Sequence, residues 1–347
     1  MRRRPVLVAG AALVVAAAAL AGTLVGDGDS SPDPAPGPRS GATPTTARSL
    51  VDIKGEPGSA TVEARLLRDP DVLWVGTWET TDWPNLHGAG SFRDVDNTTI
   101  GDFGLGGAGR SLRARTPKGN RQGFGYHASF ERAGIGALDD VHYRYRVFFP
   151  DDYVWRNRRG GGGGKLPGLA GKAPGGDEEK VGAGGQRWNG ATEVGRRDVA
   201  DADGWSARLL WNKDRTLATY LYAPWPVGLP SRRSWFGYSQ TCRADPHDRE
   251  STKLELRSGA WNTIELHVRM NTPGHRDGVF ELWLNGRRCV DRVDIEYRSA
   301  AHPDLRITEQ YVTWFYGGPP SDAPDRDATI YFDDAVLSRS YIGPRRN

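Results

Sequence analysis

Strict alternation of apolar and polar side chains predicts β-strands along much of this chain. The clearest example covers residues 142–149, where Tyr143 and Tyr145 face one side and the arginines between them face the other. Pro150 closes that stretch, because proline cannot continue a strand ladder. Residues 261–268 alternate in the same way. We therefore expect strands that bury one face and carry polar side chains on the other.

Further strand-like stretches follow one another, separated by turn-rich connections. They cover residues 72–76, 123–130, 279–284, 311–316 and 328–336. Asn285 and Gly286 form a hairpin signal. Helical periodicity is absent from the sequence, and 45 Gly and 23 Pro favour turns over helices. With no internal repeat and no boundary after residue 60, we predict one all-β domain over residues 58–343, a sandwich of two antiparallel sheets.

The first 57 residues differ from this pattern. Residues 1–21 combine three arginines with an apolar run and small residues near Ala21, which is typical of a secretory signal peptide. If the segment stays uncleaved, it would instead anchor the protein to a membrane. Residues 22–57 are rich in Pro, Gly, Ser and Thr and read as a disordered linker. We expect a secreted or membrane-tethered extracellular protein.

Charge and aromatic content narrow the function. The formal net charge of +3 comes from Arg2, Arg3 and Arg4, so a globally basic nucleic-acid-binding protein is not expected. A local excess remains between Arg156 and Arg197, with nine Lys or Arg against four Asp or Glu. Such a segment suits an acidic polymer, although a solvated basic loop would look the same. The 12 Trp and 12 Tyr provide material for a core and for stacking on sugars.

The most informative stretch extends from Gly160 to Trp225. Five glycines precede a lysine, and two strand-like segments follow, joined by a polar, turn-like connection at residues 212–215. If these segments pair as a hairpin, their polar side chains share one sheet surface next to that lysine. The residues concerned are Lys165, Ser206, Arg208, Tyr220 and Tyr222. The alternative is an ordinary polar face of an antiparallel sheet.

These phrases resemble a known family. Gly-Gly-Lys-Leu-Pro-Gly-Leu at residues 163–169, followed by Trp-Ser-x-Arg and Tyr-x-Tyr, resembles the alginate and glucuronan lyases of polysaccharide lyase families 14 and 20. Further matches lie at residues 259–262, 280–286 and 313–318, and the resemblance covers residues 70–342. It implies a β-jelly roll with a concave substrate-binding sheet. It also implies that the five polar residues named above are catalytic.

A lyase of this kind removes the C5 proton of a uronic acid and expels the sugar linked at C4. Arg208 can bind the neighbouring carboxylate through two hydrogen bonds, which neutralises it and stabilises the developing charge. Lysine and tyrosine ordinarily titrate near pH 10, so a base needs a lowered pKa. We expect Lys165 to be the base and Tyr222 or Tyr220 the acid, although the sequence leaves this assignment open.

Other residues are weaker candidates for contacts with the substrate. Gln186, Arg187 and Trp188 precede the Trp-Ser-x-Arg strand and could form a sugar subsite, or an ordinary loop. His127 lies on an expected strand and could hydrogen-bond a sugar, or be structural. The charged, Gly-rich insert at residues 172–203 could reshape the cleft. We expect a monomer whose partner is an acidic polysaccharide.

Two other functions and two structural features complete the sequence-based expectations. A non-catalytic, lectin-like jelly roll would need only a stacking and polar surface. A retaining glycosidase would need paired carboxylates, and Asp294 and Glu296 have that spacing away from the basic cluster. Cys242 and Cys289 could form one disulfide. The chemistry requires no cofactor, but a structural calcium ion could bind near the C-terminus. Its candidate ligands are Asp325, Asp327, Asp333 and Asp334.

Overall fold

The computed structural model describes residues 54–55, 63–93, 95–104, 109–173, 204–223 and 240–344. All of them belong to a compact unit that spans residues 47–347. The expected signal peptide and most of the expected linker lie outside these ranges. Lys54–Gly55 belong to the expected linker, yet they form a short strand, β1. No helix in the described ranges is long and apolar enough to cross a membrane.

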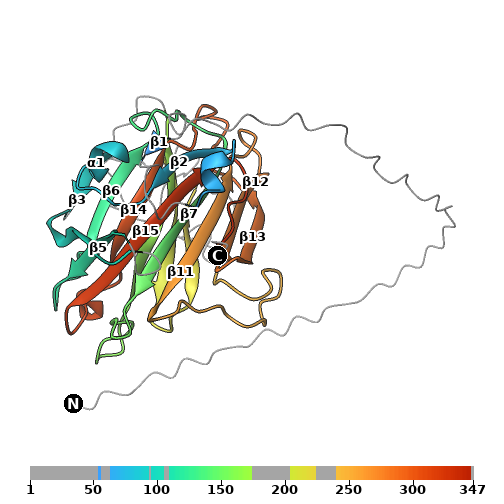
Figure 1. Cartoon of the computed structure of the whole chain (residues 1–347). Coiled ribbons are helices and arrows are strands. Elements are labelled where there is room, and N and C mark those ends of the chain that lie inside the picture. Colours follow the sequence, from blue (N-terminus) through green and yellow to red (C-terminus); the bar gives the residue numbers. More distant parts are fainter. Residues whose placement is uncertain are drawn as a thin grey trace, which may run out of the picture. The chain divides into compact units, whose positions relative to one another are not determined.

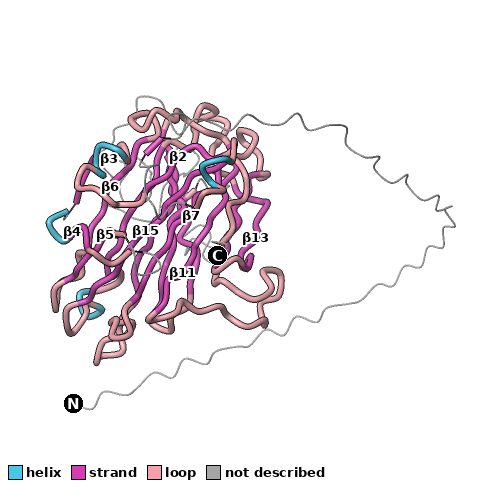
Figure 2. The backbone as a smooth tube through the Cα atoms, viewed as in Figure 1, coloured by secondary structure: helices cyan, strands magenta, loops and turns pink. Residues whose placement is uncertain are grey.

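The described strands form two β-sheets (Figures 1 and 2). The nine-stranded sheet has the order β1, β2 (Val72–Gly76), β15 (Ala328–Ser338), β7 (Asp140–Phe149), β11 (Ala260–Arg269), β12 (Gly278–Leu284) and β13 (Arg287–Ile295). In addition, β5 (Ser111–Thr116) pairs with β15, and β4 (Thr98–Gly101) pairs with β5. The six-stranded sheet has the order β10 (Leu217–Tyr222), β9 (Gly204–Asn212), β8 (Gly163–Lys172), β14 (Glu309–Tyr316), β6 (Phe124–Ser129) and β3 (Ala89–Arg93).

Within the described ranges, helical structure is confined to short pieces. They are α1 (Trp83–Leu86) and three 3₁₀ turns, at Leu66–Arg68, Val95–Asn97 and Pro320–Asp322. Every named strand pair is antiparallel except β1 with β2, which is parallel. The expected all-β jelly-roll sandwich of two antiparallel sheets is therefore confirmed. The Asn-Gly signal is confirmed as well, since Asn285 and Gly286 both have positive φ and connect the antiparallel pair β12–β13.

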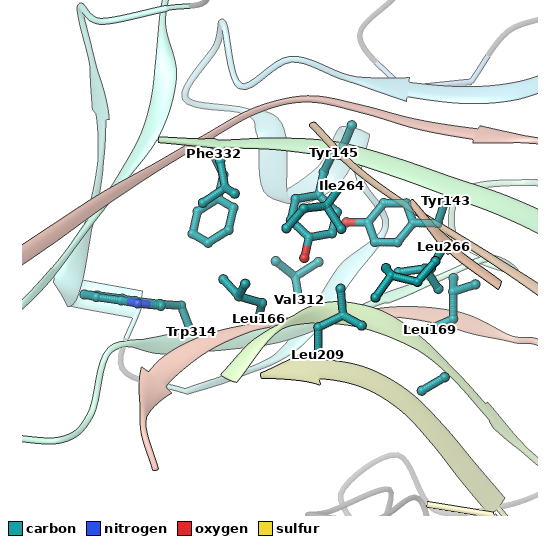
Figure 3. Packing of buried hydrophobic residues seen from close by; sticks show 14 of the residues in the cluster. Tyr143, Tyr145, Leu166, Leu169, Leu209, Ile264, Leu266, Val312, Trp314 and Phe332 are labelled. Carbon is teal, nitrogen blue, oxygen red and sulfur yellow. The ribbon is translucent and has the colours of Figure 1, made fainter. Parts of the chain in front are cut away.

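The core lies between the two sheets and follows from the alternation of side chains. Figure 3 shows Tyr143, Ile264 and Phe332 of the nine-stranded sheet meeting Leu209 and Trp314 of the six-stranded sheet. Each of these side chains is almost completely buried. Removing a buried aliphatic or aromatic side chain of this size from water contributes roughly 1.5–3 kcal/mol. The inner faces therefore fix which side chains each sheet presents on its outer face.

The outer face of the nine-stranded sheet carries a buried network of ion pairs. Arg144 of β7 donates to Glu63 at 2.8 Å, to Asp334 at 3.0 Å and to the Gly343 carbonyl at 3.0 Å. Arg146 donates to the same Asp334 oxygen at 2.7 Å. Arg144 is completely buried, so this polar face of β7 is covered rather than solvated. Glu63 and Gly343 thereby hold the two ends of the domain against β7.

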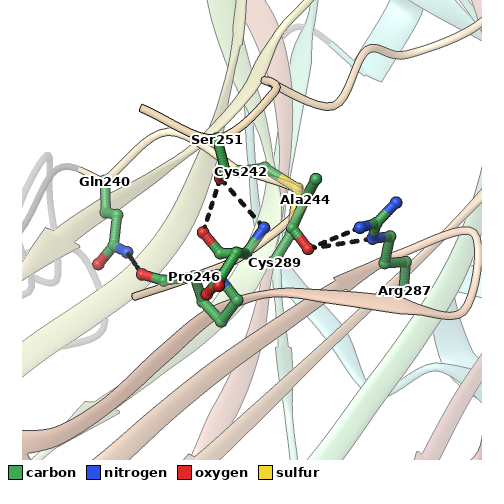
Figure 4. The surroundings of a disulfide bond; sticks show 8 residues. Gln240, Cys242, Ala244, Pro246, Ser251, Arg287 and Cys289 are labelled. Carbon is green, nitrogen blue, oxygen red and sulfur yellow. Dashed lines mark hydrogen bonds between the residues drawn. A yellow bond between two sulfur atoms is a disulfide. The ribbon is translucent and has the colours of Figure 1, made fainter. Parts of the chain in front are cut away.

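A disulfide links Cys242 and Cys289, the pairing that the sequence suggested (Figure 4). Cys289 belongs to β13, an edge strand of the nine-stranded sheet. The Cys242 amide donates to the carbonyl of Leu217 in β10, an edge strand of the six-stranded sheet. The disulfide therefore joins the edges of the two sheets on the side of the sandwich where β10 lies.

Candidate active site

The hairpin expected from the sequence is confirmed. Strands β9 and β10 are antiparallel, with Arg208 opposite Tyr220 and Ser206 opposite Tyr222. Four alternating residues of β9 enter the core, namely Trp205, Ala207, Leu209 and Trp211. The residues between them therefore face the other way. We call this outward side of the six-stranded sheet the site face.

Lys165 reaches the site face from the neighbouring strand β8. A β-bulge between Leu166 and Leu169 lets both leucines enter the core. Two glycines allow the close strand approach next to this bulge. A Cβ on Gly164 would lie 2.1 Å from the Phe315 carbonyl oxygen, and one on Gly168 would lie 1.9 Å from the carbonyl oxygen of Ala207. Side chains at these positions would push β8 away from its neighbours, so the glycines hold Lys165 close to β9 and β14.

Aromatic rings surround the two cations. Lys165 Nζ lies 3.6 Å from the centre of the Tyr220 ring, and Arg208 Cζ lies 5.1 Å from it. Both distances are within the range of cation–π attraction. The hydroxyls of Tyr220 and Tyr222 are hydrogen-bonded at 2.6 Å, with their rings perpendicular. Four of the five predicted catalytic side chains therefore form one contiguous group.

The lysine and the two tyrosines of this group have pKa values that shift in opposite directions. Burial, reinforced by the charge of Arg208, lowers the pKa of Lys165 to about 7. A substantial fraction of Lys165 is therefore a neutral amine at neutral pH, and able to accept a proton. Burial raises the pKa of both Tyr220 and Tyr222, although the Arg208 charge opposes this. The two phenols therefore keep their protons at neutral pH and can donate them.

Ser206, the fifth predicted residue, is completely buried opposite Tyr222. Its hydroxyl is buried and makes no hydrogen bond with any residue in the described ranges. A buried hydroxyl without a partner costs roughly 1–3 kcal/mol, so a donor or acceptor at this position would be favourable.

Strands β14 and β6 extend the site face and bring in residues that the sequence reasoning missed. Tyr311 of β14 lies opposite His127 of β6, and their rings are 4.2 Å apart. Arg208 Cζ lies 4.3 Å from the centre of the Tyr311 ring. Glu309 accepts a 2.8 Å hydrogen bond from His127 Nδ1. The sequence predicts a strand over residues 311–316. Its alternation would place Tyr311 next to the basic cluster only if the order of the strands were known.

His127 itself lies on the site face, as its candidacy as a sugar ligand requires. Its Nδ1 is taken by Glu309, and the ring is only partly exposed. In the described part of the chain Nε2 makes no hydrogen bond, so it is the ring atom that a sugar hydroxyl could reach. The other predicted sugar contacts, Gln186, Arg187 and Trp188, lie outside the described residues, as does most of the insert at residues 172–203.

The remaining candidates do not gather at this site. Asp294 lies on β13 of the other sheet and pairs with Arg292 and Arg276, so a glycosidase carboxylate pair at that position would not share a sheet with the cations. Asp334 pairs with arginines and Asp327 with Arg115. Within the described ranges no group of three or more His, Cys, Asp or Glu could hold a metal ion. Asp325, Asp327, Asp333 and Asp334 therefore do not form such a group.

Comparison with known proteins adds independent information. Residues 110–335 match the family model described as Polysaccharide lyase 14. No curated protein matches the sequence. A marine PL-14 alginate lyase from Aplysia kurodai has a similar structure, with a TM-score of 0.55 and 19% identity, covering 77% of this chain and 98% of that chain.

Two further solved structures are similar. An alginate lyase from Chlorella virus gives a TM-score of 0.51 with 19% identity, covering 73% of this chain and 92% of that one. A mutant alginate lyase in complex with an alginate trisaccharide gives 0.51 with 17% identity, covering 74% and 90%. At these identities the likeness shows a shared fold.

Proposed function

The chain belongs to the polysaccharide lyase 14 family, and we propose that it cleaves a uronic-acid polymer, alginate or glucuronan, by β-elimination at the site face. The observation that carries this proposal is the pairing of a lysine of lowered pKa with an arginine and two protonated phenols on one surface. Elimination next to a carboxylate needs a group that neutralises the carboxylate, a base and an acid. The group on the site face provides all three.

Arg208 neutralises the uronate carboxylate in this proposal. Its planar guanidinium can donate two parallel hydrogen bonds to a carboxylate. Withdrawing the negative charge makes the C5 proton more acidic and stabilises the enolate-like charge that develops in the transition state. Arg208 is buried, so solvent screens this interaction less than it would at an exposed site.

Lys165 acts as the base, because it is the member of the group with a pKa lowered to about 7. Its amine takes the C5 proton, and the electron pair left on C5 forms the C4–C5 double bond as the C4–O bond breaks. Tyr220 or Tyr222 donates a proton to the departing oxygen, since both phenols remain protonated. The 2.6 Å hydrogen bond between them lets either phenol be resupplied by the other.

The remaining predicted residues receive supporting roles. The Ser206 hydroxyl, which has no partner in the described part of the chain, can hydrogen-bond Tyr222 or the substrate after a small shift. His127 offers Nε2 to a sugar hydroxyl, and Gln186, Arg187 and Trp188 form a further subsite. No cofactor takes part in this mechanism.

We also propose that the protein is exported and works as a monomer. The arginines and apolar run of residues 1–21 support export with cleavage near Ala21, and the disulfide suits an oxidising compartment. N-terminal sequencing of the secreted protein tests this, because an intact Met1 in the membrane fraction would mean that the segment is an anchor.

The reaction is tested by incubating the protein with polymannuronate, polyguluronate and polyglucuronate. Alginate is tested first, since the similar structures described above are alginate lyases. Elimination leaves a C4–C5 double bond conjugated with the carboxylate, and we expect ultraviolet absorbance to rise on one of these polymers. Arg208→Ala should reduce the rate on the order of a hundredfold or more. A contaminating lyase would not respond to this substitution, so the loss would assign the activity to this protein. New reducing ends without absorbance would indicate a hydrolase, and binding without either would indicate a lectin.

A further inference from the structure

Tyr311 lies in a row of residues that crosses the six-stranded sheet at one level. Strand pairing places it opposite Gly168 of β8 on one side and opposite His127 of β6 on the other. Gly168 in turn approaches Arg208, since a Cβ on this glycine would lie 2.7 Å from the Arg208 Cα. Because Gly168 carries no side chain, the long Arg208 side chain can extend across β8 towards Tyr311.

The contact between Arg208 and Tyr311 is a cation–π contact. Arg208 Cζ lies 4.3 Å from the centre of the Tyr311 ring, closer than the 5.1 Å that separates it from the Tyr220 ring. A planar guanidinium is attracted to the face of an aromatic ring and keeps its in-plane N–H donors available while it stacks. Tyr311 can therefore hold Arg208 without using the donors that a carboxylate needs.

Tyr311 is itself supported from behind. The His127 ring lies 4.2 Å from the Tyr311 ring with an interplanar angle of 31°. Glu309, which is buried, holds His127 through the 2.8 Å hydrogen bond to Nδ1. Glu309, His127, Tyr311 and Arg208 thus form a continuous series of contacts that leads from a buried carboxylate to the guanidinium.

We propose that Tyr311 is a positioning residue that holds the Arg208 guanidinium in its productive orientation, with His127 and Glu309 supporting the ring. This inference rests on the proposed function, in which Arg208 neutralises the substrate carboxylate. An unsupported arginine side chain samples many rotamers, and ordering it during the reaction would lower the rate. A guanidinium held in advance avoids that reorganisation.

Two substitutions separate the ring of Tyr311 from its hydroxyl. Tyr311→Phe keeps the ring, so we expect kcat within about twofold of wild type, given the size of cation–π contacts. Tyr311→Leu keeps bulk but removes the π face, and kcat should fall about 3- to 30-fold while KM changes less. Thermal unfolding of both variants should match wild type, since Tyr311 is partly exposed. If Tyr311→Phe loses as much as Tyr311→Leu, the hydroxyl acts on the substrate and the positioning role is wrong.

A second measurement tests whether Tyr311 acts through Arg208. In an Arg208→Met background no cation remains to contact the ring, so adding Tyr311→Leu should change the residual rate less than twofold, by the logic of a double-mutant cycle. An undiminished loss in that background would overturn the inference.

A crystal structure of Tyr311→Leu gives a result that does not depend on substrate. We expect the Arg208 guanidinium to leave its place in Tyr311→Leu and to keep it in Tyr311→Phe. An unmoved guanidinium in Tyr311→Leu would contradict the inference even if the enzyme is active. A wild-type protein without activity on any polyuronate would contradict the proposed function, while a displaced guanidinium would still support the positioning contact.

Discussion

The two outer faces of the sandwich use the same kinds of charged residue in opposite ways. On the nine-stranded sheet, Arg144 and Arg146 are held by the carboxylates of Glu63 and Asp334 at hydrogen-bonding distance. On the six-stranded sheet, Arg208 lies over the rings of tyrosines, and Lys165 forms no ion pair with any described residue.

This difference separates arginines that are held by carboxylates from an arginine that lies against aromatic rings. A buried arginine whose donors are satisfied by carboxylates cannot offer them to a ligand, and removing it leaves uncompensated negative charge. Arg208 lies against aromatic rings instead, and a guanidinium that stacks on a ring can still direct in-plane N–H donors at a carboxylate. The same reasoning applies to the lysine, since an ion-paired Lys165 would stay charged, whereas burial next to Arg208 lowers its pKa to about 7.

The largest effect should come from Lys165→Ala. Loss of the base should reduce kcat on the order of a hundredfold to ten-thousandfold. Stability should not fall, because a lysine whose pKa is lowered by folding opposes folding when it is charged. Lys213→Ala is the matched control, since Lys213 hydrogen-bonds the Gly160 carbonyl from an exposed position. Initial rates on the preferred polyuronate and thermal unfolding check both statements, and a Lys165→Ala enzyme with near-normal kcat would exclude Lys165 as the base.

Arg144→Ala should have the opposite effect, lowering stability while leaving kcat unchanged. It removes the completely buried cation that bridges Glu63 and Asp334, which should lower the free energy of unfolding by about 3–5 kcal/mol. Each molecule that remains folded should keep normal kcat, because Arg144 lies on the sheet opposite the site face. Denaturant unfolding measures the loss.

Arg115→Ala is the control for Arg144→Ala, since the pair of Arg115 with Asp327 is half exposed. Its removal should cost no more than about 1 kcal/mol. Equal losses for the two arginines would mean that the buried network does not hold the domain ends as described.

Much of the fold could be predicted because alternation reports directly on which face of a strand is buried. The pattern at residues 142–149 correctly placed Tyr143 and Tyr145 in the core and the arginines outside it. It could not show that Arg144 is completely buried, because the residues that cover it lie far away in sequence, at Glu63 and Gly343. The same pattern on β9 and β10 predicted the shared surface of Arg208 and Tyr220.

The site was predicted only as far as neighbouring strands are close in sequence. Lys165, Arg208 and Tyr220 lie within one stretch and were expected together. Tyr311 is about a hundred residues away and joins them only because β14 pairs with β8, a strand order that no local pattern specifies. The lowered pKa of Lys165 likewise depends on burial and on the nearby Arg208, which are properties of the assembled sheet.

The smallest effects should appear in the pH dependence of activity and of stability. Here the two outer faces of the sandwich should respond in opposite directions. On the site face, kcat/KM should rise with pH, with an apparent pKa near 7, as Lys165 loses its proton. Because the pKa of Tyr222 is raised, kcat/KM should then stay high up to pH 10. On the nine-stranded sheet, burial lowers the pKa of His267, but its bonds to Asp140 and Glu281 outweigh this and raise it to about 9.

Because folding raises the pKa of His267, its stabilising contribution is complete below about pH 6.5 and is lost as pH rises through about 9. Activity should therefore increase over the pH range in which this contribution to stability declines. Unfolding of wild type and His267→Gln at pH 6 and pH 10 measures the second trend, and the difference between the two proteins should shrink at pH 10. A difference that grows with pH would mean that His267 is held neutral, and a kcat/KM profile without a limb near pH 7 would show that Lys165 does not titrate as the base.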